Sequence, residues 1–118
     1  MKTPIKTELA QHLLNLINDG VLTDENRDDW HFHAFNEDYY IIGYYQCNQW
    51  LKKHDIDAFE AIEEVINYSQ ENFGEMSTAI NSEAVVNMLA FIYGEELLSE
   101  IDANSIEELK DELQELVS

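Results

Sequence analysis

Basic residues are scarce in this sequence. Its 118 residues include six lysines and arginines against 25 aspartates and glutamates, which gives a formal net charge of −19. A surface this negative is repelled by nucleic-acid phosphates and by anionic lipid headgroups. We therefore expect neither direct nucleic-acid binding nor membrane association, and the first of these is the function that the composition excludes most firmly.

Cysteine, glycine and proline are also rare. Cys47 is the only cysteine, so an internal disulfide framework is excluded and a reducing cytosol is the expected environment. The four glycines are isolated, which excludes a glycine-rich phosphate-binding loop. The first eight residues, Met-Lys-Thr-Pro-Ile-Lys-Thr-Glu, lack the apolar core of a signal peptide. We expect a cytoplasmic protein.

No apolar run is long enough to cross a membrane. The apolar run 84–93 carries no charge, contains Asn87 as its only amide and would form roughly 15 Å of helix, about half of a membrane span. A helix that is apolar on every side belongs in the middle of a domain. We therefore predict a central core helix over about 82–101, within a chain whose 45% hydrophobic content is typical of folded proteins.

Apolar residues at helical spacing predict further helices around this core helix. The predicted ranges are about 4–18, 24–35, 39–53, 58–73 and 106–116. Thr23 or Asp24 is the expected cap of the second helix, and Asp55 or Asp57 that of the fourth. Gly94 is a candidate kink in the core helix. The prediction is an all-α, compact single-domain bundle of five or six helices spanning residues 1–118.

One segment is open to a second interpretation. Residues 39–45, Tyr-Tyr-Ile-Ile-Gly-Tyr-Tyr, are rich in strand-forming residues. The run continues to Lys53 without a turn signal, however, and no other segment offers a partner strand. A lone strand would leave its backbone groups unpaired, so a helix is the preferred prediction.

Candidate catalytic and metal-binding groups are few. His31 and His33 lie near two aspartates, but residues two apart on a helix diverge by about 200° and cannot chelate one ion there. Packing or capping is the favoured interpretation of both histidines. Cys47 has no identifiable base near it, which favours a buried thiol over a nucleophile. We predict no catalytic, cofactor-binding or metal-binding residues, and we do not expect an enzyme.

The acids are unevenly distributed along the chain. Residues 54–118 contain seventeen acids and one base, Lys110, for a net charge of −16. Solubility of a small domain needs only about 2–8 charges. Like-charged pairs three or four apart, such as Glu108–Glu112, weaken a helix by roughly 0.2–0.5 kcal/mol each. A solvated surface or adaptation to high salt is one explanation, and a functional role for the excess charge is the other.

The acids of the last predicted helix are spaced almost like phosphates. Five acids and one lysine give one net charge per roughly 4.5 Å of helix, against one phosphate per about 3.4 Å of a B-DNA strand. The pattern predicts carboxylates that replace phosphates in the basic groove of a DNA-binding protein, with Tyr68 or Tyr93 as additional contacts. The predicted partner-binding acids are Glu60, Glu63, Glu64, Glu71, Glu95, Glu96, Glu107, Glu108, Asp111, Glu112 and Glu115.

A second function remains open. Ile106, Leu109, Leu113 and Leu116 form a narrow apolar seam along the last helix. A small acidic adaptor or assembly protein could bind a partner through an apolar groove or through this seam.

Size, charge and the order of three short motifs resemble one known family. Asp28-Asp29-Trp30-His31, then Tyr44-Tyr45, then Ile56-Asp57 are similar in order to motifs of the small acidic phage DNA-mimic antirestriction proteins, the Ocr-like family. The resemblance implies a phage-encoded homodimer in the host bacterial cytoplasm that blocks the DNA groove of restriction, CRISPR or other defence enzymes. The chain departs from that family in ending with a leucine-seamed helix instead of a long acidic tail.

Overall fold

The computed structural model describes residues 3–35, 44–73 and 82–118, and these ranges contain helices and no strand. The elements are α1 (Thr3–Asn18), the 3-10 helix η1 (Arg27–Asp29), α2 (Trp30–Ala34), α3 (Tyr44–Lys53), α4 (Ala58–Phe73), α5 (Ser82–Ile101) and α6 (Ile106–Val117). The predicted all-α fold is confirmed. For the ambiguous segment, α3 shows helix from Tyr44 onward, and positions 39–43 lie outside the described residues.

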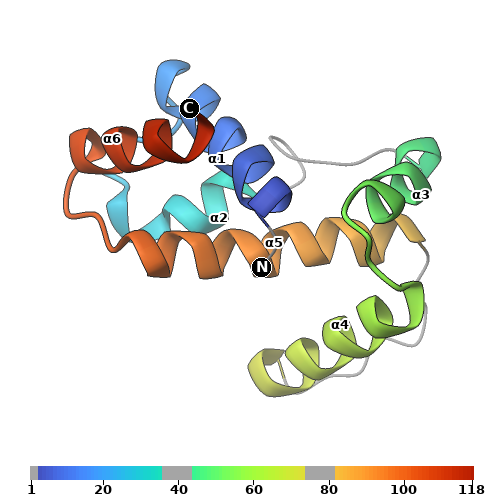
Figure 1. Ribbon diagram of the computed structural model, residues 1–118. Coiled ribbons are helices and arrows are strands. Elements are labelled where there is room, and N and C mark those ends of the chain that lie inside the picture. The colour runs from blue at the N-terminus through green and yellow to red at the C-terminus, as the bar shows by residue number, and fades with distance from the viewer. Residues whose placement is uncertain (1–2, 36–43, 74–81) are drawn as a thin grey trace.

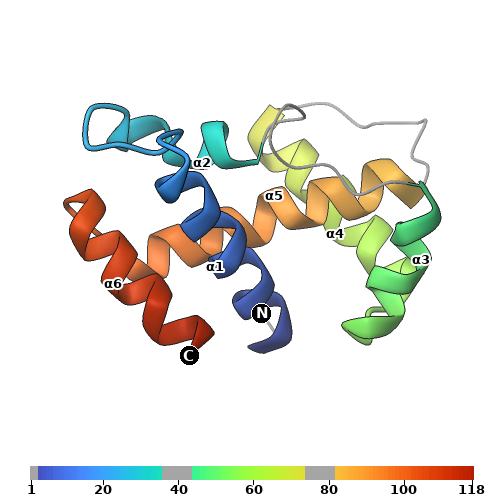
Figure 2. The same cartoon turned by 90° about the horizontal axis from the view of Figure 1, so that it is seen from above.

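The long helix α5 is the centre of the arrangement. It contacts α1, α2, α3 and α4, and α1 and α6 pack against each other beside its C-terminal half (Figure 1). Viewed from above, α6 and α3 lie at opposite ends of α5 (Figure 2). Val86, Leu89 and Ala90 are fully buried, while Met88 and Phe91 on the remaining sides of α5 are half-buried. The uncharged run thus forms the core helix that its composition predicts.

The pairing of α1 with α6 closes the other half of the core. Leu9 and Leu13 of α1 and Leu109 and Leu113 of α6 all have 0% exposure. Burial of each leucine contributes roughly 1.5–3 kcal/mol relative to an exposed one. The apolar seam predicted on the last helix is therefore an internal contact surface of the fold.

Side-chain caps define where two helices begin. The Asp57 carboxylate accepts hydrogen bonds from the Phe59 and Glu60 backbone N–H groups at 2.8 and 3.2 Å, as predicted for the cap of α4. The Ser105 hydroxyl accepts one from the Glu108 N–H at 3.2 Å at the start of α6. Glu108 in turn accepts from the Asn104 N–H at 2.8 Å, one residue before the position that a capping box requires.

The second predicted helix is shorter than expected. It begins at Arg27 rather than near residue 24, because the Asn26 side chain organises a turn before it. Asn26 Oδ1 accepts from the Thr23 N–H and Asn26 Nδ2 donates to the Val21 carbonyl, both at 2.8 Å. Such local bonds compete with helix formation. Asp24, expected as a cap of this helix, accepts from the Ile106 N–H at 2.7 Å and helps to cap α6 instead.

Two expectations about single residues need correction. Phe59, which helical spacing within the predicted helix 58–73 places among the apolar residues of α4, is 83% exposed. Ala61 and Val65 define the buried face of α4, and two positions on a helix separate Phe59 from Ala61 by about 200°. Gly94 lies inside one continuous helix, where a Cβ would come within 2.2 Å of the Phe35 ring, so its role is to admit that ring.

Candidate functional site

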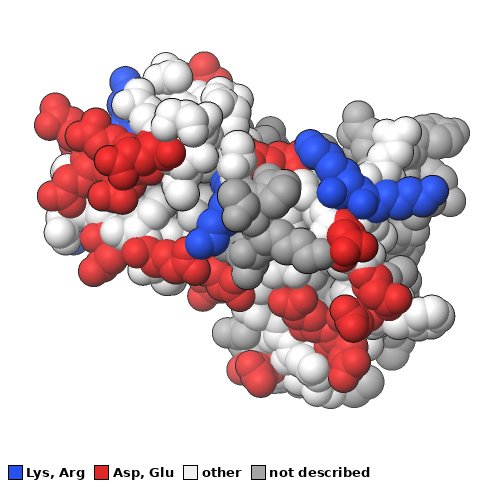
Figure 3. Space-filling model, in the orientation of Figure 1, with Lys and Arg blue, Asp and Glu red and all other residues white. Residues whose placement is uncertain are grey.

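The eleven acids predicted to bind a partner fall into two groups. Six of them lie on α4 and α5, and the other five lie on α6. All are exposed except Glu64, which is half-buried. Figure 3 shows acidic side chains over α6 at the upper left, along α5 below it, and over α4 at the lower right. The structure therefore brings the first six together and places the α6 acids at a distance from them.

The first group lines a hollow between α4 and α5, which we name the acidic trough. One part has a volume of about 400 Å³ and is lined by Glu60, Glu63, Glu64, Asn67, Tyr68, Glu71, Ile92 and Glu96. A neighbouring part of about 510 Å³ shares Tyr68 and Glu96 and extends along α5 to Glu95, Ser99 and Glu100. None of the described residues that line either part is basic. The trough is thus a concave surface of one charge sign, which focuses a negative potential.

Two tyrosines fix the orientation of acids in the trough. The Tyr68 hydroxyl donates a hydrogen bond to Glu95 Oε2 at 2.6 Å, and the Tyr93 hydroxyl donates to Glu64 Oε2 at 3.1 Å. Each bond joins α4 to α5. Burial, followed by the hydrogen bond and charge of Glu95, raises the pKa of Tyr68 to about 12. Burial and the nearby Glu64 raise the pKa of Tyr93 further, so both hydroxyls remain donors at neutral pH.

In the part of the chain that the structure describes, cations do not pair with the predicted acids. Within the described ranges, none of the eleven forms an ion pair. Lys6 pairs with Glu100 at 2.9 Å, and Lys53 lies 3.9 Å from Glu8, so both lysines are directed to acids outside the predicted set. The negative potential over α4, α5 and α6 therefore remains available to an external partner.

Sequence reasoning missed Glu100 as a member of the trough. Glu100 lies four positions after Glu96 and so on the same face of α5, a spacing that could have revealed it. The pairing of Glu100 with Lys6 of α1 could not be read from the sequence. This ion pair places one cation beside the trough, at the end nearest the C-terminus of α5.

The α6 acids occupy the outer face of their helix. Leu109 and Leu113 turn toward α1 with 0% exposure, so the intervening acids face solvent. The adaptor hypothesis offered the seam that these leucines form as one of two binding surfaces. That surface is already covered by α1, and it is not free for a partner.

The histidines that were considered as metal ligands have structural contacts. The His31 Nε2–H donates to the Phe91 carbonyl at 2.9 Å, and the two rings lie 4.0 Å apart between centroids. Across the described ranges, no three His, Cys, Asp or Glu side chains converge as a metal site. The Cys47 side chain lies outside the described residues.

In the part of the chain that the structure describes, no helix combines the length and apolarity that a bilayer span requires.

Comparison with known proteins gives no assignment: the chain matches no protein-family model, no curated protein and no solved structure.

Proposed function

We propose that this protein is a DNA-mimic inhibitor, which occupies the DNA-binding groove of host restriction, CRISPR or other DNA-engaging defence enzymes. The observation that supports the proposal is the set of eleven predicted acids, unpaired with cations in the described ranges and held on three helices. Helices present carboxylates at fixed intervals, whereas a flexible acidic tail would lose more conformational entropy on binding.

The dimensions of the molecule suit such a role. Carboxylates three or four positions apart on a helix are separated by about 5–6 Å at their Cβ atoms. Each strand of B-DNA carries one phosphate per roughly 3.4 Å of the duplex axis. The longest dimension of the protein is 39 Å. One turn of B-DNA occupies about 34–36 Å, so one molecule would fill a groove built for roughly one helical turn.

Electrostatics favour a basic groove as the partner surface. Self-repulsion among the acids weakens the isolated fold, and lysines or arginines of a partner would relieve it. Attraction between surfaces of opposite sign accelerates association and makes it sensitive to salt. The resemblance to the Ocr-like family extends the proposal to a homodimer acting in the cytoplasm of a bacterial host.

The proposal is tested by immobilising the protein and adding purified restriction and CRISPR enzymes. Each enzyme is added in two forms, either free of DNA or saturated with duplex DNA. We expect the free enzyme to bind and the DNA-saturated enzyme to be excluded, with affinity falling as salt rises. The triple variant Asp111→Asn, Glu112→Gln, Glu115→Gln should bind more weakly. A control variant, Asp19→Asn, Glu25→Gln, Asp29→Asn, removes three exposed charges outside the predicted set and should bind normally. Equal binding by free and DNA-saturated enzymes would refute the proposal.

A further inference from the structure

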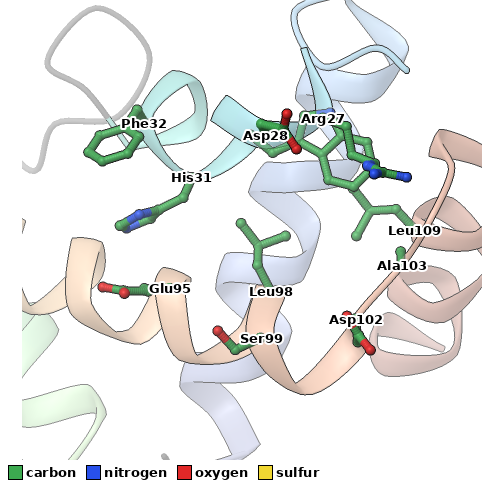
Figure 4. Close-up of a pocket in the computed structure, with 11 residues that line it drawn as sticks. Arg27, Asp28, His31, Phe32, Glu95, Leu98, Ser99, Asp102, Ala103 and Leu109 are labelled. Atoms are coloured by element: carbon green, nitrogen blue, oxygen red, sulfur yellow. The ribbon is translucent and has the colours of Figure 1, made fainter. Parts of the chain in front are cut away.

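A pocket of about 340 Å³ lies between the η1–α2 segment and the C-terminal half of α5, next to the acidic trough. It shares Glu95 and Ser99 with the trough. Its inner side is apolar, since Leu98 lines it together with the buried Trp30 and Leu109. Figure 4 shows His31 and Phe32 of α2 on the opposite side of the pocket from Glu95 and Ser99.

An exposed aromatic ring stands at the end of this pocket that is nearest the trough. Phe32 is 61% exposed, although a ring of this size is normally buried. Its centroid lies 5.2 Å from the His31 ring and 6.0 Å from the Phe91 ring. An exposed ring face attracts cations, most effectively the planar guanidinium group.

The charges around the pocket favour a positive ligand. Among the described residues that line it, Asp28, Glu95 and Asp102 carry negative charge and Arg27 is the only lysine or arginine. Arg27 donates from Nη1 to the Asn104 carbonyl at 2.9 Å, and Figure 4 shows its side chain directed toward Leu109 and away from Phe32. Glu95 is oriented by Tyr68, and a carboxylate has acceptor capacity for more than one donor. The end near Phe32 is therefore negative and open.

We infer that this pocket receives an arginine side chain of a protein partner, with the methylene stem against Leu98 and the guanidinium at the end of the pocket that Phe32 and Glu95 line. A phosphate or carboxylate ligand would be repelled by the three acids. A purely apolar ligand would desolvate them without compensation. Lysine would satisfy the charge but offers no planar group to stack on the ring. The inference deepens the proposed function, on which it rests, by naming an arginine of the basic groove as the group that the pocket binds.

The pocket is tested without any partner protein, by titrating the isotope-labelled full chain with N-acetyl-arginine amide and, separately, with N-acetyl-lysine amide in NMR. A single side chain should bind with a Kd in about the millimolar range. We expect saturable shifts at the amides of Phe32, Glu95 and Ser99, with tighter binding of the arginine probe. Phe32→Leu should weaken arginine binding by about two- to five-fold, which is the loss of one exposed cation–π contact.

Phe59→Leu is the matched control, because Phe59 is also an exposed phenylalanine beside acids but lies outside the pocket. It should leave arginine binding unchanged. The inference is overturned if both probes shift the acids of α4 and α6 as strongly as the pocket, if no saturable shift occurs, or if the two leucine variants behave alike. Failure of the DNA-competition test with normal arginine binding would instead reject the proposed function and retain the pocket.

Discussion

The hydroxyl of Tyr68 and the carboxylate of Glu95 lie 2.6 Å apart, and their hydrogen bond joins α4 to α5 at the middle of the acidic trough. Glu95 also lines the pocket beside Phe32. The same carboxylate therefore belongs to both surfaces, and its orientation depends on a tyrosine that must keep its proton.

Alkaline pH should break this link. The pKa of Tyr68 is raised to about 12, above the value of 10.0 expected for an unfolded chain. The unfolded state loses its proton first, so the contribution to stability is complete below pH 10 and is lost as pH rises toward 12. Urea unfolding across this range should show a steeper loss for the wild type than for Tyr68→Phe. Parallel curves would contradict the account of this bond.

Mild acid should act through His12. Its Nε2–H donates to the Ala34 carbonyl at 2.6 Å, and burial lowers its pKa from 6.5 although this hydrogen bond opposes the shift. The unfolded chain therefore takes up the proton first, and stability is lost as pH falls below 6.5. His12→Gln, which retains a donor, should reduce this dependence. The relevant measurement is the difference in melting temperature between variant and wild type at several pH values, because protonation of surface acids affects both proteins. A constant difference would contradict the prediction.

Substitution of Gly94 tests how closely the Phe35 ring, at the C-terminal end of α2, packs against α5. A Cβ at this position would lie 2.2 Å from Cε2 of the buried Phe35 ring. Gly94→Ala should destabilise the protein by about 1–3 kcal/mol through overpacking, which exceeds the roughly 0.5–1 kcal/mol that alanine contributes to a helix. Adding Phe35→Leu should restore part of the loss in urea unfolding. Ser99→Ala, at an exposed position of the same helix, should be nearly neutral. A stabilised Gly94→Ala variant would show that the ring does not pack there.

The acids of α6 should reduce stability while they support binding. Glu112→Gln removes the like-charged pairs with Glu108 and Glu115, which are four and three positions away on the helix. Each pair costs about 0.2–0.5 kcal/mol, so the variant should gain roughly 0.4–1 kcal/mol at low ionic strength. The gain should fade in high salt, where surface charges are screened. If the variant is less stable than the wild type in low-salt thermal unfolding, repulsion between the acids of α6 does not lower the stability of the fold.

The sequence predicts the elements of this fold better than the arrangement of its charges. Long periodic segments such as 4–18 and 106–116 form helices close to the predicted ranges, because their leucines require a partner surface. The turn around Asn26 and the outward direction of Phe59 depend on local hydrogen bonds and helix register that periodicity alone does not define. The division of the acids into a trough and a separate α6 face depends on the packing of α6 on α1, which is a long-range contact.

The measurement that tests the central claim most directly is recovery of bacterial proteins on the immobilised full chain with and without competing duplex DNA, at low and high salt. The account predicts a DNA-binding protein that is captured at low salt and lost when duplex DNA or salt is added. Capture should also fall for the variant Asp111→Asn, Glu112→Gln, Glu115→Gln and persist for the control variant at positions 19, 25 and 29. Equal recovery of the same protein in the presence of saturating duplex DNA would contradict the account.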